Sequence, residues 1–242
     1  MTTAPATRPS VRSPLRPPLL AALGLALLAA AVSAAAGEEL RGRVELLAKG
    51  GKGPARGSDV RQAVVYYEPA VPQPLRPPAK PFELLTRQKE FSPRVLAIAR
   101  GSRVRFPNAD PILHNVFSVS PGNAFDLGIY REGAPAEKRF DNPGVVRVFC
   151  NVHHAMVAYI LVLDTPFSAS PAADGSFVLT GVPKGEGRLS VWHEQADPWT
   201  LEIALPQAAP VAARLEMVRP QIPPHLNKSG QSYSRNGDRY RR

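Results

Sequence analysis

The stretch VVRVFCNVHHAM, residues 145–156, joins a predicted strand to a short loop. Apolar and β-branched residues dominate its first half, which is typical of a strand. That strand ends at Cys150, the one cysteine of the chain. His153 follows three positions later and Met156 three positions after that. The loop therefore carries three side chains that can bind a soft metal ion.

A fourth candidate ligand lies upstream in the run PILHNV, residues 111–116, which is also strand-like. This residue is His114. One thiolate, two imidazoles and one thioether make up the ligand set of a blue-copper electron-transfer site. We expect His114, Cys150 and His153 to bind copper in a trigonal arrangement, with Met156 as a weak axial ligand.

Other interpretations of these residues are possible from the sequence. A lone cysteine in an exported chain cannot form an internal disulfide, so it pairs between chains, stays buried and inert, or binds something. A structural zinc site would favour cysteine and histidine ligands without methionine. His154 could also compete with His153 as the ligand. The two residues are adjacent, and the orientation of a ligand ring depends on the hydrogen bond made by its other nitrogen.

The motif Cys-x2-His-x2-Met, together with the upstream His-Asn-Val, resembles the cupredoxins, and its loop spacing is closest to that of amicyanin. The text around it, FPNAD at 106–110 and FDNPG at 140–144, is similar to plastocyanin-like methylamine-utilization proteins. The resemblance covers residues 80–165. It implies that the backbone N–H of Asn115 donates to the Cys150 sulfur and that Asn108 ties the two ligand loops together.

The rest of the chain also predicts strands, because β-branched runs are short and separated by Gly, Pro and Asn turns. Within 80–165 the expected strands are 91–99, 102–106, 112–118, 136–140, 145–150 and 157–163. This favours an all-β fold with a cupredoxin Greek-key β-sandwich. Residues 38–69 and 168–217 resemble the two halves of a carboxypeptidase-regulatory-like module. We expect them to form a second, smaller β-sandwich, into which the copper domain is inserted.

The two ends of the chain hold most of its net charge of +10. Three arginines precede the apolar run 19–31, and small residues follow it, so 1–36 reads as a secretory signal peptide cleaved after Ala34 or Ala36. An uncleaved membrane anchor is the alternative.

Residues 219–242 are polar and basic and predict a disordered tail, with His225 in no fixed role. His193 is expected to be an ordinary strand-end residue. No further run is long enough to cross a membrane.

These observations together predict a periplasmic copper protein that carries single electrons between a donor and an acceptor protein. The basic tail would steer an acidic partner or an anionic surface. Basic residues interleaved with aromatic ones on one face are missing, which argues against nucleic-acid binding. The sequence contains neither a Ser/His/Asp catalytic set nor a second histidine cluster, so it does not predict an enzyme. The alternatives are a copper storage or delivery protein and a binding module without redox activity.

Overall fold

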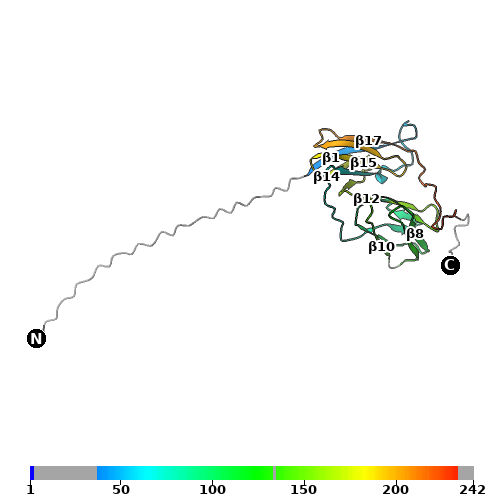
Figure 1. Ribbon diagram of the computed structural model, residues 1–242, viewed down its shortest axis with the longest axis horizontal. Helices are drawn as coiled ribbons and strands as arrows, with labels where there is room; N and C mark the ends of the chain where they lie inside the picture. Colours follow the sequence, from blue (N-terminus) through cyan, green and yellow to red (C-terminus); the bar gives the residue numbers. More distant parts are fainter. Residues whose placement is uncertain (3–36, 133–134, 234–242) are drawn as a thin grey trace. The chain divides into compact units, whose positions relative to one another are not determined.

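The computed structural model describes residues 1–2, 37–132 and 135–233. The predicted signal peptide, apart from Met1 and Thr2, and the last part of the predicted tail lie outside these residues. The folded part belongs to the compact unit that begins at Ala36 (Figure 1). Among the described residues there is no helix of the length and apolarity that a membrane span requires.

Almost every regular element is a strand. The first elements are β1 (Glu38–Leu47), the single-turn 3-10 helix η1 (Val60–Gln62) and β2 (Val64–Pro69). The middle of the chain forms β3 (Phe82–Glu83), β4 (Leu85–Arg87), β5 (Glu90–Ser92), β6 (Val95–Ala99), β7 (Arg103–Phe106), β8 (His114–Ser118), β9 (Phe125–Tyr130), β10 (Ala136–Arg139), β11 (Gly144–Cys150) and β12 (Val157–Leu163). The last elements are β13 (Phe167–Ala169), β14 (Ser176–Val182), β15 (Gly185–Trp192), β16 (Trp199–Leu205) and β17 (Val211–Glu216). The predicted all-β fold is confirmed.

The middle strands form one sandwich. Its larger sheet has the order β6-β12-β11-β8-β9, and β10-β7-β3 forms a smaller sheet. The core between them is built from alternate residues of these strands, among them Val104, Phe106, Val148 and Ile160, all fully buried. Cys150 and Met156 belong to this same core, so the predicted ligand loop is anchored in it.

The first and last strands form the second sandwich. Strand β1 pairs antiparallel with β14 and parallel with β17, while β2 pairs antiparallel with β13 and β15. The strands that pair with β1 and β2 therefore all follow the middle sandwich in the sequence. The two sheets enclose a separate core that includes Leu40, Tyr67 and Leu189. Its resemblance to carboxypeptidase-regulatory-like modules stays a prediction.

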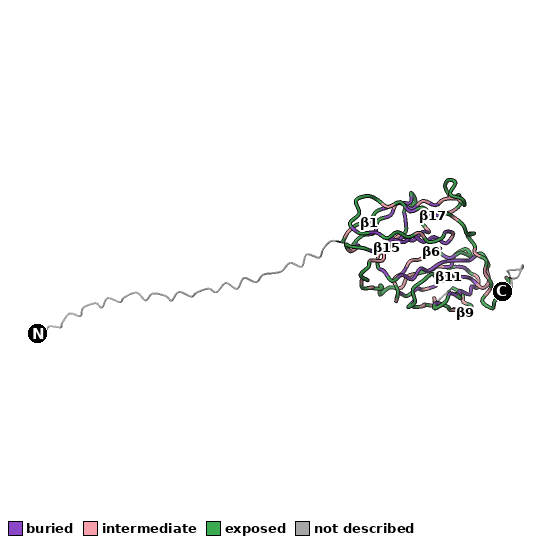
Figure 2. The backbone as a smooth tube through the Cα atoms, turned by 45° about the horizontal axis from the view of Figure 1, so that its top comes forward, coloured by how far each residue is buried: buried purple, intermediate pink, exposed green. Residues whose placement is uncertain are grey.

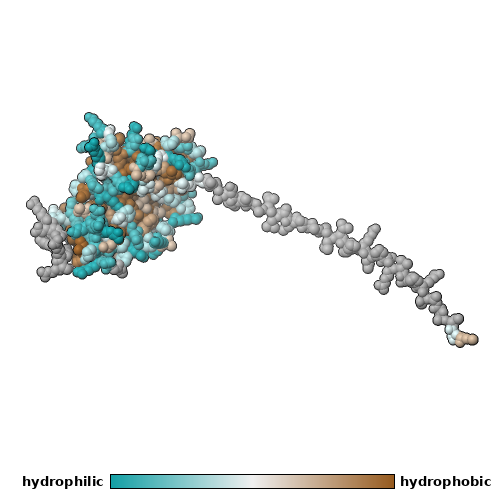
Figure 3. All heavy atoms as spheres, turned by 180° about the vertical axis from the view of Figure 1, so that it is seen from behind, coloured by the Kyte–Doolittle hydropathy of each residue, from teal (hydrophilic) through white to brown (hydrophobic). Residues whose placement is uncertain are grey.

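The two sandwiches share a third apolar cluster. Strand β12 is buried along its whole length, because its two faces contact different cores. Tyr159 and Leu161 project from its outer face and pack with Val64 and Trp192 of the second sandwich. Figure 2 shows buried backbone running along the strands of both sandwiches, with exposed loops around them. On the face seen in Figure 3, hydrophilic and hydrophobic side chains are interspersed.

Replacing Gly187 with alanine is expected to destabilise the second sandwich by about 1–3 kcal/mol, the usual cost of overpacking. A Cβ atom at this position would lie 2.4 Å from the ring of Tyr67 and 2.6 Å from the carbonyl oxygen of Glu68. Tyr67 is fully buried and the Glu68 contact is with the backbone, so the new Cβ could be accommodated only by a shift of the packed strands. Denaturant unfolding of Gly187→Ala, compared with the exposed neighbour Glu186→Ala, measures the cost; equal midpoints for the two variants would contradict it.

The tail departs from its predicted disorder over residues 219–233. Arg219 pairs with Asp197 and donates to the carbonyl of Ala196, and later residues contact the middle sandwich. The low apolar content of this segment suggested that it could not pack. It is instead held by single ion pairs, hydrogen bonds and ring contacts.

Candidate metal centre

Three neighbouring strands bring the predicted ligands together. His114 begins β8, and Cys150 ends β11, which pairs antiparallel with both β8 and β12. The register places Cys150 opposite Val116, two residues after His114. The ligand loop is closed by two backbone hydrogen bonds, from Cys150 N–H to Met156 C=O at 3.2 Å and from Met156 N–H to His153 C=O at 3.1 Å. The loop therefore turns His153 back toward the cysteine.

The donor atoms of His114, Cys150 and His153 all lie within 4.8 Å of one another. The Cys150 Sγ is 3.6 Å from His114 Nδ1 and 3.7 Å from His153 Nδ1. Metal bonds of about 2.0 Å to nitrogen and about 2.3 Å to sulfur, opened to roughly 120°, would separate N and S by about 3.7 Å. The two nitrogen–sulfur distances therefore match those expected when Cys150 and each histidine bind the same metal ion.

Met156 lies beside this group in the sequence and in the core. Its side chain is 1% exposed and packs in the same apolar cluster as Cys150. A buried thioether next to a thiolate suits a soft metal such as copper. Its role as the axial ligand stays a prediction.

The two adjacent histidines have different surroundings. His153 is half-buried and faces the sulfur, whereas His154 is exposed. The ring of His154 stacks on that of His225, with centroids 4.4 Å apart and planes 8° from parallel. The structure thus brings His153, and not His154, to the cysteine.

The sulfur is surrounded by backbone donors. Burial raises the pKa of the Cys150 thiol, and the N–H groups of Asn115, Val152 and His153 oppose that shift. The Val152 nitrogen lies 3.5 Å from Sγ. The Asn115 contact is the one that the cupredoxin resemblance implies. Such donors favour the thiolate that a metal ion requires.

Asp110 is a part of the site that the sequence analysis did not single out. Its Oδ2 lies 2.9 Å from His114 Nε2, on the side of the ring away from the sulfur. Burial opposes its ionisation, but backbone N–H groups of Lys89 and Gln88 and the His114 ring outweigh burial and lower the carboxyl pKa. Burial lowers the pKa of His114, and Asp110 opposes this. The carboxylate therefore fixes the ring with Nδ1 directed at Cys150.

The β4–β5 hairpin supports Asp110 with an unusual turn. Gln88 and Lys89 both have positive φ, 54° and 61°, a conformation that glycine or asparagine favours. Their N–H groups donate to the Asp110 carboxylate at 2.5 and 2.9 Å. Residues held in this region usually need support from their surroundings, and here the carboxylate provides it.

Asn108 has a different role from the one that the resemblance implies. Its Oδ1 accepts the N–H of Asp110 at 2.9 Å, and its Nδ2 donates to the carbonyl of Ile112 at 3.0 Å. Both bonds lie within the loop before His114, because the Asn108 side chain folds back along its own segment. Asn108 thus shapes the loop that presents Asp110 and does not join it to residues 150–156.

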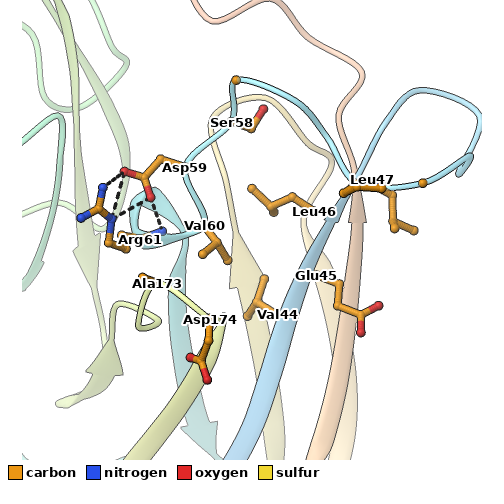
Figure 4. A pocket seen from close by; sticks show the side chains of 14 residues that line it. Val44, Glu45, Leu46, Leu47, Ser58, Asp59, Val60, Arg61, Ala173 and Asp174 are labelled. Carbon is orange, nitrogen blue, oxygen red and sulfur yellow. Dashed lines mark hydrogen bonds and ion pairs between the residues drawn. The ribbon is translucent and has the colours of Figure 1, made fainter.

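A cavity of about 830 Å³ lies in the second sandwich, beside η1 (Figure 4). Val44, Leu46 and Val60 give it an apolar wall. Two of its polar residues, Asp59 and Arg61, are bonded to each other, and Glu45, Ser58 and Asp174 also line it. None of the four predicted copper ligands lines this cavity, so it is separate from the metal centre.

No protein-family model matches the chain, and no curated protein matches it. Among solved structures, it is similar to a Cu-containing nitrite reductase from Thermus scotoductus SA-01, at 21% identity and a TM-score of 0.34 over 40% of this chain. The match spans only 25% of the reductase. A purple cupredoxin from Nitrosopumilus maritimus matches at 24% identity and a TM-score of 0.31, over 34% of this chain and 99% of its own. An oxidised methionine-to-leucine variant of amicyanin matches at 16% identity and a TM-score of 0.32, over 34% and 81%.

Proposed function

We propose that this chain is an exported copper protein that carries single electrons between a donor and an acceptor protein. The observation that supports this most is the convergence of one thiol and two imidazole Nδ1 atoms at 3.6 and 3.7 Å, beside a buried methionine. When bound there, copper would supply a one-electron couple between Cu(I) and Cu(II).

The side chains around the site suit an electron carrier because they hold the ligands still. His114 and Cys150 lie on paired strands and are fully buried. Asp110 fixes the His114 ring, and backbone N–H groups surround the sulfur. A site that keeps one geometry in both oxidation states loses little energy to rearrangement when an electron moves.

Access to the site is through the ligand loop. Of the three converging residues only His153 is partly exposed, so we expect electrons to enter and leave at the edge of its ring. The basic residues after Tyr233 would steer an acidic partner, an effect that salt should weaken. Residues 1–36 would direct the chain to the periplasm.

Visible and EPR spectra of the copper-loaded chain, beside those of Cys150→Ser, test this proposal. We expect one copper per chain, an intense blue band and a reversible one-electron wave, all lost in the serine variant. A colourless site that passes its copper to a chelator would instead indicate storage or delivery. Absence of stoichiometric copper would indicate a binding module, and preferential zinc binding a structural site.

Replacing Asp110 with alanine is expected to weaken copper binding by about 10–100-fold, the usual cost of losing an outer partner of a metal-bound histidine. The His114 ring would lose the bond that sets its orientation, and two N–H groups would lose their acceptor. Competition with a chromophoric chelator measures the affinity. Glu90→Ala, an exposed change in the same hairpin, serves as the control; equal affinities would show that Asp110 does not hold the ring.

A further inference from the structure

Residues 221–233, here called the C-terminal strap, lie against the ligand loop. Pro223, His225 and Asn227 are half-buried and alternate with exposed residues, as in an extended segment that has one face on a surface. Arg94 holds its first residue by donating to the carbonyl of Gln221 at 2.5 Å. The strap then contacts residues 149–154 at three points.

The first contact is a stack of rings. His225 lies between Phe149, at 4.2 Å and 14°, and His154, at 4.4 Å and 8°. Phe149 precedes the cysteine ligand and His154 follows the histidine ligand, so the stack spans the segment that contains both. The Nε2 atom of His225 is buried without a hydrogen-bond partner in the described part of the chain. The ring therefore acts on the loop chiefly through its faces.

The second contact is at the backbone of Cys150. The hydroxyl of Tyr233 donates to the Cys150 carbonyl at 2.9 Å. Since the Cys150 N–H donates to Met156, both backbone polar groups of the cysteine are engaged. The Tyr233 ring also meets the ring of His154 edge-on, with centroids 5.0 Å apart.

The third contact joins the strap to Asn151 of the ligand loop and to β9, which pairs with the strand that carries His114. The N–H of Lys228 donates to Asn151 Oδ1 at 2.9 Å, and its Nζ lies 2.7 Å from Asp126 Oδ2. Asp126 in turn accepts from the Asn115 side chain. A tight turn through Asn227, which accepts from Ser229 and Gln231, sets the distance between these contacts.

We propose that the C-terminal strap is a positioning element of the metal centre, in which His225 and Tyr233 hold the ligand loop so that His153 stays directed at Cys150. The expected effect of the strap on bound copper rests on the proposed function. Its effect on the loop is expected in the metal-free protein as well, because every contact described is made by the polypeptide alone.

The experiment compares the full chain with Tyr233→Phe, His225→Ala, the double variant of both, and Ser232→Ala as an exposed control. Hydrogen exchange of the metal-free protein reports on the amides of residues 151–155. We expect exchange there to rise about fivefold in each single variant, as loss of a contact worth about 1 kcal/mol implies, and more in the double variant. Exchange in β1 and β15 should not change.

The copper-loaded proteins supply the second readout. We expect the reduction potential and the EPR copper hyperfine splitting to shift in Tyr233→Phe and His225→Ala and to stay unchanged in Ser232→Ala. His225→Phe, which preserves the stack, should restore the native values. Native exchange and native spectra in the double variant would overturn the proposal, and so would faster exchange with native spectra. If the native chain binds no copper, the proposed function fails, while the exchange data still decide whether the strap holds the loop.

Discussion

Alanine at position 153 is expected to abolish the intense blue copper band, whereas alanine at position 154 should leave the band in place. His153 Nδ1 is one of the three atoms that converge on the site, and His154 is exposed and stacks on the strap. Removing a direct ligand should cost more affinity than the 10–100-fold typical of an outer partner. Visible absorption and chelator competition on the two variants measure this effect.

The adjacent positions make the two variants a matched pair. Both remove one imidazole from the same loop, so a general loss of loop structure would affect them similarly. We expect His154→Ala to shift the potential only slightly, through its contact with His225. A native band in His153→Ala together with a lost band in His154→Ala would assign the ligand to His154.

Replacing Arg94 with alanine is expected to destabilise the folded chain by about 3–5 kcal/mol, because it leaves a buried carboxylate without its partner. The side chain of Glu194 is 0% exposed and that of Arg94 18%, and Nε and Oε1 are 2.7 Å apart. Arg94 also donates to the carbonyl of Val157, the residue after Met156. Denaturant unfolding measures the loss.

A second substitution tests the cause. In Arg94→Ala/Glu194→Leu no charge is left buried, so most of the lost stability should return. If the double variant is as unstable as the single one, the loss arises from the hydrogen bonds of Arg94 to Val157 and Gln221 and not from the unpaired carboxylate.

The cost of Arg94→Ala should also shrink as the pH falls from 7 toward 5. Burial raises the pKa of Glu194, and Arg94 opposes that rise. Without Arg94 the folded-state pKa is higher still, so the folded variant binds a proton that the unfolded chain releases. A carboxyl group whose pKa is raised on folding makes the folded state less stable as the pH rises through that raised pKa. Unfolding of both proteins at several pH values checks this; a cost that grows on acidification would contradict it.

Most of the strands could be predicted from the sequence because apolar side chains alternate in them and turn residues separate them. Strand β9 was missed. It contains Asp126 and Gly128, residues that strands disfavour, and its register with β8 shifts between Asn115 and Phe117. Gly128 has a φ of +73° at this irregularity. A bulge of this kind is stabilised by the neighbouring strand, which local sequence does not reveal.

In the candidate site, too, residues that are close in the sequence could be predicted, and residues brought in from distant segments could not. Cys150, His153 and Met156 are close in sequence, so their spacing alone indicates a metal loop. Asp110 depends on hairpin residues 21 and 22 positions upstream, and His225 and Tyr233 depend on a segment whose composition suggests disorder. Contacts made by single polar residues leave no periodic signal, and only the folded chain shows where they lie.

Because β1 and β2 pair with strands from the last part of the chain, we expect a cut between them and the middle sandwich to leave the protein assembled. Cleavage in the proline-rich segment 70–81 would cut one of the two covalent connections between the middle and the second sandwich, yet the fragments should remain associated. The N-terminal piece is hydrogen-bonded through β1 and β2 to four strands beyond residue 165. The middle sandwich is consequently connected to the second sandwich at both of its ends and is not carried on a single linker. Under the proposed function, electron-transfer partners would therefore have to dock directly against the middle sandwich.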